Sequence, residues 1–156
     1  MTPVKSRLLI VDTSVMRAAG MSEHPVSSAC RETLQAVLDI CHRVALTDTI
    51  RAEWKRHRSR FSGRWWRSML ARRKVSTLIS PASITLDTSA YTPANRRVVE
   101  KDRCLIEAAL AADGVLVTAD DEFREALETM PKGKALSDRI RWLHPVRDGV
   151  QSLTRL

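Results

Sequence analysis

The sequence predicts a single α/β domain in which a central parallel sheet of four to five strands carries helices on both faces. The length of 156 residues suits one domain with its own core. Short apolar runs alternate along residues 1–156 with longer amphipathic segments, which is typical of β-α-β units and three layers. In such sheets ligands bind beyond the carboxyl ends of the strands. The residues that follow each strand are therefore the first candidates for a functional site.

The first half of the chain is expected to alternate strands and helices. Arg7–Asp12 and Arg43–Thr47 are short apolar runs bounded by charge, so both are predicted strands. Between them, Val26–His42 gathers its apolar side chains on one face, which indicates an amphipathic helix. A basic helical pair is predicted over residues 49–74, with one helix over 49–59 and the next over 63–74.

The second half continues the alternation. Ser83–Asp87, after Pro81, is expected to be a short strand. Asn95–Ala112 is a predicted long helix closed by Asp113 and Gly114, because glycine readily adopts the left-handed conformation that ends helices. The remaining elements are expected to be a strand, a helix that Pro131 ends and a last strand, over Val115–Thr118, Asp121–Met130 and Ile140–Leu143.

The charge balance is the unusual bulk property. The chain has 26 Lys and Arg against 18 Asp and Glu, a net charge of +8, which indicates a polyanionic partner: nucleic acid first, and an anionic membrane surface second. No apolar stretch is long enough to span a bilayer, and the N-terminal apolar run is too short for a signal peptide. We therefore expect a cytoplasmic protein that does not bind membranes.

Most of the surplus charge lies in residues 51–74, which carry ten basic residues and one acid. The same stretch contains three tryptophans, and basic residues interleaved with aromatic rings suit single-stranded nucleic acid. Trp54 is expected in the core. The alternatives for the rest are a second core tryptophan, a solvated helix face, or a surface that binds a protein. The residues predicted to contact nucleic acid are Arg51, Lys55, Arg56, Arg58, Arg60, Arg64, Arg67 and Trp65.

Four acids are predicted to meet at the carboxyl edge of the sheet. Asp12 ends the first strand and Asp120 follows Val115–Thr118, while Asp102 falls on the apolar face of its helix and Glu53 borders an apolar stripe. Gathered carboxylates repel one another unless a cation intervenes, and hard oxygen ligands select Mg²⁺ or Mn²⁺. The reaction that needs this arrangement is metal-assisted phosphodiester hydrolysis. Taken singly, each acid has another explanation, as a helix cap, an ion-pair partner or an exposed residue.

Four segments of the chain resemble the PIN domain family, most closely its small prokaryotic VapC-like toxins. They are LLIVDTSV (8–15), VALTDTIRAEW (44–54), KDRCLIEAALAADGVLVTAD (101–120) and TADDEF (118–123). The resemblance implies a three-layer PIN-like fold and a Mg²⁺- or Mn²⁺-dependent endoribonuclease that acts as the toxin of a type II toxin–antitoxin pair. It implies RNA as substrate, an antitoxin partner and a homodimer. Residues 51–74 are longer and more basic than in a compact VapC toxin.

The resemblance also implies a role for each site residue. Asp12, Asp102 and Asp120 match the principal metal ligands, and Glu53 matches an acid that binds the metal through water or orients the attacking water. Ser14 and Thr118 match hydroxyls that support these ligands, whereas Asp121 is either a further acid for a second metal or part of the first turn of a helix.

Other readings of the same chain remain. A non-catalytic RNA-binding or assembly subunit with a PIN-like fold is the main alternative. A haloacid-dehalogenase-type phosphatase needs a second Asp where this chain has Ser14, and a dinucleotide-binding enzyme needs clustered glycines that the five of this chain do not form.

Overall fold

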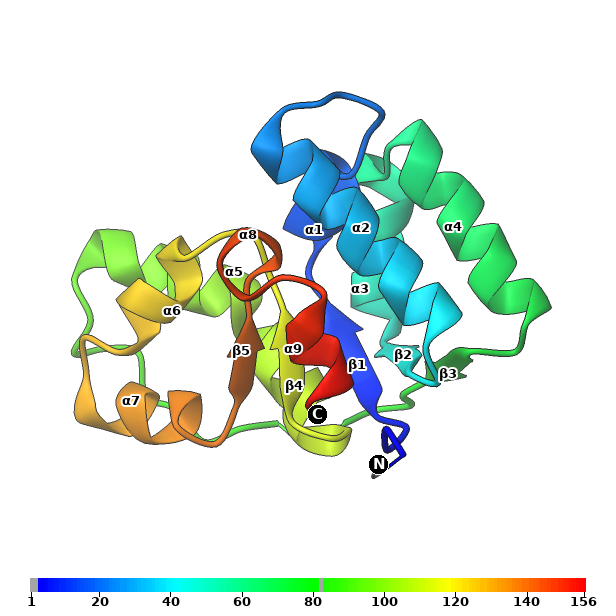
Figure 1. Ribbon diagram of the computed structural model, residues 1–156. Helices are drawn as coiled ribbons and strands as arrows, with labels where there is room; N and C mark the ends of the chain where they lie inside the picture. Colours follow the sequence, from blue (N-terminus) through cyan, green and yellow to red (C-terminus); the bar gives the residue numbers. More distant parts are fainter. Residues whose placement is uncertain (1–2, 82) are drawn as a thin grey trace.

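The computed structural model describes residues 3–81 and 83–156. Five parallel strands form one sheet in the order β3-β2-β1-β4-β5 (Figure 1). They are β1 (Leu8–Val11), β2 (Arg43–Leu46), β3 (Val75–Thr77), β4 (Val115–Val117) and β5 (Arg141–Leu143). The helices are α1 (Thr13–Ala18), α2 (Pro25–Asp39), α3 (Asp48–His57), α4 (Arg60–Ala71), α5 (Pro93–Ala111), α6 (Glu122–Leu127), α7 (Pro131–Ser137), α8 (Pro145–Asp148) and α9 (Gln151–Thr154).

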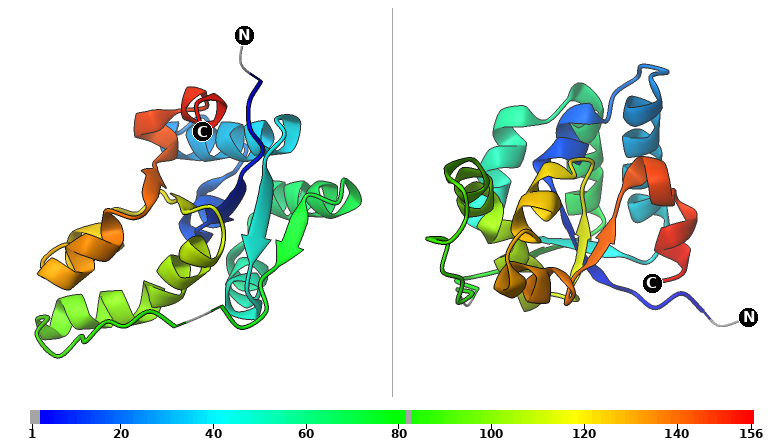
Figure 2. Two further views of the ribbon diagram at one scale, coloured as in Figure 1. Left: turned by 90° about the horizontal axis from the view of Figure 1, so that it is seen from below. Right: turned by 90° about the vertical axis from the view of Figure 1, so that its left-hand side faces the viewer.

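Helices cover both faces of this sheet, so the predicted α/β architecture is confirmed and is consistent with a three-layer PIN-like fold. Helix α2 lies on one face, with α8 and α9 beside it, whereas α5 crosses the other face and contacts β1 and β4 (Figure 2). Helix α4 packs beside α2, and α1 lies beyond the carboxyl ends of the strands, next to α3 (Figure 1). The described residues contain no helix long and apolar enough to cross a membrane.

The core is built on the three central strands, whose inner residues are all apolar. Leu9, Ile10 and Val11 of β1 are fully buried, as are the apolar residues of β2. Strands that are apolar on both faces need cover on both faces, which explains why uninterrupted apolar runs rather than alternating ones mark them in the sequence.

The third predicted strand is wrong, because residues 83–87 are not a strand. Val75–Thr77 instead pairs with Val44–Leu46 and forms the edge of the sheet. Side chains of α5 form hydrogen bonds with the backbone of residues 83–87. Glu107 Oε2 accepts from the Ile84 N–H at 3.2 Å, and Arg103 donates to the Ile84 carbonyl at 2.5 Å. The segment therefore satisfies part of its hydrogen bonding on a helix.

The region after β4 also differs in detail from the prediction. The helix expected over 121–130 ends earlier, as α6, and Pro131 begins the separate helix α7. A proline suits the first turn of a helix, where its missing N–H has no partner to lose. Gly114 behaves as predicted: it has φ of +74° and its N–H donates to the Ala109 carbonyl at 2.9 Å, which closes α5.

Two glycines that both lie within helices should respond in opposite ways to the same substitution. A Cβ on Gly133 of α7 would lie 2.0 Å from the Leu127 carbonyl oxygen, whereas one on Gly63 of α4 would meet nothing closer than 3.6 Å. We expect Gly133→Ala to lower the free energy of unfolding by about 2 kcal/mol and Gly63→Ala to raise it by about 0.5 kcal/mol. Urea unfolding of both variants measures this, and a neutral Gly133→Ala would show that α7 is not packed as described.

Candidate functional site

The candidate site lies at the point where the order in which strands are added to the sheet reverses. From β1 the chain builds outward to β2 and β3, then returns to place β4 on the other side of β1 and β5 beyond it. In open parallel sheets the crevice outside the carboxyl ends of the strands at such a point is the usual binding site. Here the point lies between β1 and β4.

Strand register brings Asp12 and Thr118 together at this point. Val11 pairs with Val117, so the next residue of each strand, Asp12 and Thr118, lies directly beside the other. The Asp12 N–H donates to the Val117 carbonyl at 2.8 Å, and the Thr118 hydroxyl donates to Asp12 Oδ2 at 2.8 Å.

Ser14 completes the set of hydrogen bonds that holds Asp12. Its hydroxyl donates to the same Oδ2 at 2.8 Å and accepts from the Ala119 N–H at 3.1 Å. Asp12 Oδ2 is thus fixed by two hydroxyls from different strand ends, and the other oxygen of Asp12 has no hydrogen bond within residues 3–81 and 83–156. Both hydroxyls therefore lie directly beside Asp12, where the predicted supporting role would require them.

The four predicted acids line one pocket. Asp12 and Asp120 come from the ends of β1 and β4, Glu53 comes from α3 and Asp102 from α5. Asp102 follows the fully buried Val99 by three residues and precedes the fully buried Ile106 by four, so it lies on the face of α5 that packs against the sheet. Its apolar spacing in the sequence therefore located it correctly.

Asp102 is the electrostatically strained member of the pocket. Burial, followed by the nearby charge of Asp12, raises its pKa from 3.8 to about 6, and Lys101 opposes this rise only in part. Within the described part of the chain its carboxylate forms neither a hydrogen bond nor an ion pair, in contrast to Asp12.

The other two acids are partly engaged by the protein. Glu53 accepts from Arg56 Nη1 at 2.9 Å and lies 3.6 Å from His57 Nε2, both one turn further along α3. Asp120 Oδ1 accepts from the Glu122 N–H at 2.9 Å, at the start of α6. Both residues line the pocket; Glu53 is half-buried like Asp102, and Asp120 is exposed.

The donors fit a hard divalent cation in kind, although they do not already form a closed site. Among the residues described, no group of three or more His, Cys, Asp and Glu side chains is arranged so that it could hold a metal ion as it stands. The protein contacts of Glu53 and Asp120 explain part of this. The carboxylate oxygens and the half-buried Asp102, unpaired within the described residues, nevertheless supply the ligand type and the excess negative charge that Mg²⁺ or Mn²⁺ would neutralise.

The pocket also contains residues that the sequence did not reveal. Arg17 of α1 and Lys101 of α5 line it, and Thr49 and Cys104 complete its wall. The sequence does contain one indication that Arg17 lies near the pocket, because Arg17 belongs to the short segment directly after Asp12. Burial, followed by the charge of Asp102, raises the pKa of the Cys104 thiol to about 11. Cys104 is therefore a neutral thiol at physiological pH.

Asp121 does not line the acidic pocket and directly precedes α6, so the structure favours the predicted alternative of a residue at the start of a helix over that of an acid for a second metal. Its two oxygens accept from Arg147 Nη1 and Nη2 at 2.6 and 2.7 Å, and this bidentate contact lowers the pKa of the Asp121 carboxyl. It lines a different depression, with His144 and Arg147.

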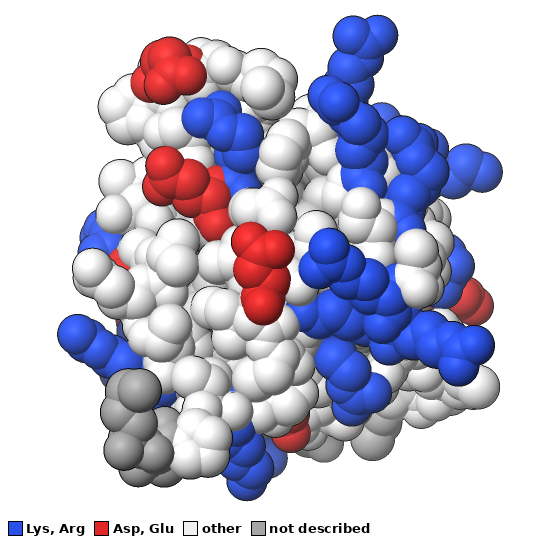
Figure 3. Space-filling model, turned by 45° about the vertical axis from the view of Figure 1, so that its right-hand side comes forward, with Lys and Arg blue, Asp and Glu red and all other residues white. Residues whose placement is uncertain are grey.

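The basic residues of α3 and α4 form a surface next to this pocket. Figure 3 shows Lys and Arg side chains concentrated on one side of the visible face, with acidic side chains beside them. Arg60, Arg64 and Arg67 are spaced by four and three residues and form an exposed stripe on α4. Arg56 is held by Glu53, whereas Arg51, Lys55 and Arg58 line a groove between α3 and α4.

The tryptophans divide differently from the prediction. Trp65 is 3 % exposed and donates from Nε1 to the Leu34 carbonyl at 2.7 Å, so it is a core residue and its assignment to a nucleic-acid surface is wrong. Trp54 is buried as predicted and donates to the Val11 carbonyl at 2.9 Å. Trp66 is the half-buried ring of this cluster, and it contacts Trp54 edge-on at a centroid distance of 5.2 Å.

No protein-family model matches the chain, and a search of curated proteins finds no match.

Proposed function

We propose that the protein is a Mg²⁺- or Mn²⁺-dependent endoribonuclease that hydrolyses phosphodiester bonds of RNA in the pocket lined by Asp12, Glu53, Asp102 and Asp120. The observation that carries the proposal is the convergence of these carboxylates at the switch point of the sheet, with Asp102 half-buried and unpaired among like charges within the described residues. A divalent cation is the simplest partner for such a group.

Asp12, Asp102 and Asp120 would hold the cation. When bound there, it would polarise a phosphate oxygen and lower the pKa of a coordinated water. The protein's own part is to orient the ligands: Ser14 and Thr118 hold one oxygen of Asp12 and leave the other directed to the pocket. Glu53, which keeps access to the pocket from α3, would orient the attacking water.

Two cations of the pocket wall would bind the substrate backbone. Arg17 and Lys101 lie at the rim of the pocket, on α1 and α5, where they are exposed. Positive side chains at these places attract the phosphates on either side of the bond that is cut. The surplus charge of α3 and α4 extends this attraction over the neighbouring surface.

The biological setting is part of the proposal. The resemblance to VapC-like toxins favours the toxin of a type II toxin–antitoxin pair acting in the cytoplasm, with an antitoxin that covers the pocket or the basic surface and with pairing of two copies. The four acid positions and the basic surface are the features of the chain that agree with it.

The direct test is cleavage of a labelled single-stranded RNA by the purified protein in Mn²⁺, in Mg²⁺ and in EDTA. We expect cleavage with either metal and none in EDTA. Cleavage that persists in EDTA would exclude the metal-dependent mechanism, and the absence of cleavage for every RNA and metal tried would exclude the enzyme.

One observation favours a second function, that of a non-catalytic RNA-binding subunit. Glu53 is already paired with Arg56 and faces His57, which reduces the charge that the pocket offers to a cation. For such a subunit, RNA binding would be unchanged when all four acids are replaced by their amides, and no RNA would be cut.

A further inference from the structure

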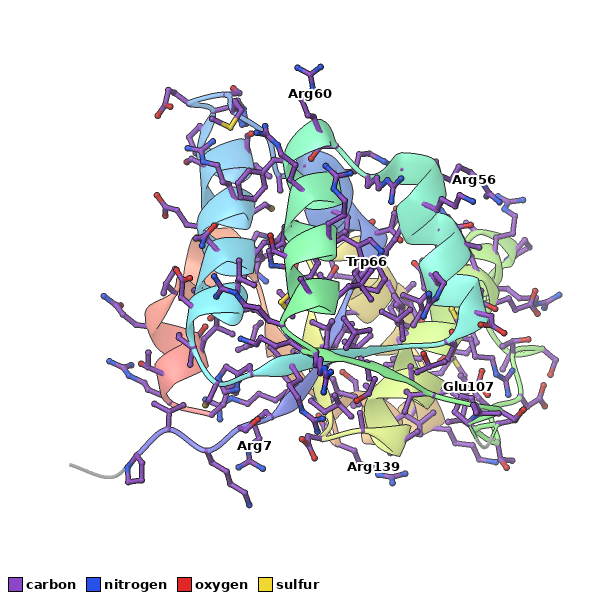
Figure 4. The ribbon with its side chains drawn as sticks, turned by 90° about the vertical axis from the view of Figure 1, so that its right-hand side faces the viewer. Arg7, Arg56, Arg60, Trp66, Glu107 and Arg139 are labelled. Carbon is purple, nitrogen blue, oxygen red and sulfur yellow. The ribbon has the colours of Figure 1, made fainter. Side chains whose placement is uncertain are left out.

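A second depression lies on the other side of α3 from the acidic pocket. It runs between α3 and α4 and is lined by Met16, Arg51, Trp54, Lys55, Arg58 and Trp66. We call it the α3–α4 groove. Figure 4 places Trp66 between the two helices, while Arg56 and Arg60 point away from it near the ends of α3 and α4 that lie far from the sheet. Trp54 forms the closed bottom of the groove, because it is 3 % exposed.

The groove combines an aromatic surface with cations that the protein leaves unneutralised. Within the described ranges, Arg51, Lys55 and Arg58 form no ion pair, whereas Arg56, Arg124 and Arg147 each contact a carboxylate. Arg51 lies over the Trp66 ring at 5.7 Å from its centroid and donates to Thr77 Oγ1 at 3.2 Å. The Arg58 side chain extends toward α4, where a Cβ on Gly63 would lie 3.6 Å from its Cδ.

The orientation of Trp66 is fixed. Its edge-on contact with Trp54 at 5.2 Å and 88° holds the ring, so that one face meets Arg51. Because Arg51 is long and exposed, its guanidinium can move away from the face of the Trp66 ring when another flat group stacks there. Its guanidinium then remains within reach of a neighbouring phosphate.

We propose that the α3–α4 groove is a binding subsite for single-stranded RNA, in which one unpaired base stacks on Trp66 and the adjoining phosphates contact Lys55 and Arg58. Stacking needs a base whose face is accessible, which a duplex does not offer. The proposal deepens the proposed function, on which it rests for the identity of the ligand, because it assigns single-stranded RNA as the substrate class.

The place of the groove sets how the strand must run. Residues 49, 50 and 53 of α3 line the acidic pocket, whereas residues 51, 54, 55 and 58 line the groove, so the two sites lie on different faces of the same helix. A bound strand must therefore pass around α3 to occupy both. We expect the groove to contribute to the binding of long substrates and not to that of short ones that only fill the acidic pocket.

Binding of a fluorescein-labelled 12-nucleotide oligouridine, measured by anisotropy in EDTA, tests the subsite without any cleavage. The groove variant Lys55→Gln/Arg58→Gln is compared with Arg60→Gln/Arg64→Gln, which removes the same charge from the exposed stripe of α4. We expect the groove variant to weaken binding by about tenfold or more and to reduce the salt slope by about 1.4, and the control variant to weaken it by less than about threefold. Equal weakening by both variants would overturn the subsite, because it would show a diffuse electrostatic surface.

Trp66 is tested by two substitutions. Trp66→Leu removes the stacking surface and should weaken oligouridine binding by about tenfold, whereas Trp66→Phe keeps a ring and should recover most of it. Circular dichroism and the unfolding midpoint establish that both variants are folded. Equal binding by folded Trp66→Leu and wild-type protein would overturn the stacking contact.

Two further ligands separate the alternatives. A duplex RNA of the same length should bind more weakly than oligouridine, and polyglutamate should not compete with it. Competition by polyglutamate together with loss of the oligouridine preference would overturn the proposal in favour of an acidic protein partner. Oligouridine binding in a protein that cuts nothing would refute the proposed function alone, whereas cleavage of long RNA unaffected by the groove variant would refute the subsite alone.

Discussion

Replacing Asp12 with Asn is expected to reduce RNA cleavage at least about 1000-fold while leaving the fold intact. The amide oxygen of Asn can accept hydrogen bonds from the same Ser14 and Thr118 hydroxyls that now donate to Asp12 Oδ2 at 2.8 Å. The amide nitrogen then takes the place of the oxygen directed at the pocket, and an NH₂ group is not a ligand for Mg²⁺ or Mn²⁺. Loss of several kcal/mol of charge stabilisation corresponds to a rate loss of this size.

Single-turnover cleavage of a labelled RNA in Mn²⁺ measures the effect. Thermal unfolding of the same preparation is the control, because the melting temperature of Asp12→Asn should stay close to that of the wild type. Cleavage by Asp12→Asn at a tenth of the wild-type rate or more would mean that Asp12 is not a ligand of the reacting metal.

Replacing Asp102 with Asn is expected to stabilise the metal-free protein at pH 7 and to abolish cleavage. The pKa of Asp102 is about 6 in the folded protein against an ordinary value of 3.8, so its ionised form opposes folding at pH 7. The corresponding gain on substitution is about 2 kcal/mol once the partial exposure of the carboxyl is taken into account. A residue that weakens the fold and is needed for metal binding is typical of a functional site.

The pH dependence of this gain follows from the direction of the shift. Above about pH 6 Asp102 is ionised in both states, and the folded state bears the whole penalty. As the pH falls through 6, the folded state takes up the proton before the unfolded state does, and the penalty disappears near pH 4. Urea unfolding in EDTA should therefore give Asp102→Asn a higher free energy of unfolding than the wild type at pH 7. At pH 4 the two free energies of unfolding should be equal.

Addition of Mn²⁺ should make the wild type more stable than Asp102→Asn, which reverses their order of stability in EDTA. Mn²⁺ at about 100 times its Kd should stabilise the wild type by about 2.7 kcal/mol and leave Asp102→Asn nearly unchanged. Equal stabilisation of both proteins by Mn²⁺ would show that the ion binds elsewhere. A wild type that is as stable as Asp102→Asn in EDTA at pH 7 would show that the carboxylate is not strained.

The sequence was sufficient to predict the parts of the site that follow from periodicity. Asp12 and Asp120 were found because apolar runs mark parallel strands, whose carboxyl ends meet at one edge of the sheet. Asp102 was found because a carboxylate stands in phase with Val99 and Ile106, both fully buried. These are regularities of spacing, which hold before any tertiary contact forms.

The errors concern contacts between elements that spacing does not specify. Asp121 is held by Arg147, 26 residues away, and a pairing at that distance has no local signal. The edge strand was misplaced because residues 83–87 bind to side chains of α5 instead of a neighbouring strand. Trp65 did have a signal, since Phe61, Trp65 and Met69 repeat every four residues and form a stripe apart from Arg60, Arg64 and Arg67.

Neighbouring residues provide the most direct test of the proposed active site. Asp120 lines the acidic pocket, whereas Asp121 is paired with Arg147 outside it. The measurement is cleavage of one labelled single-stranded RNA in Mn²⁺ by the wild type, Asp120→Asn and Asp121→Asn. The account predicts cleavage by the wild type, cleavage within about threefold of it by Asp121→Asn, because an exposed ion pair contributes little, and none by Asp120→Asn. Equal cleavage by the two variants, or none by the wild type, would contradict it.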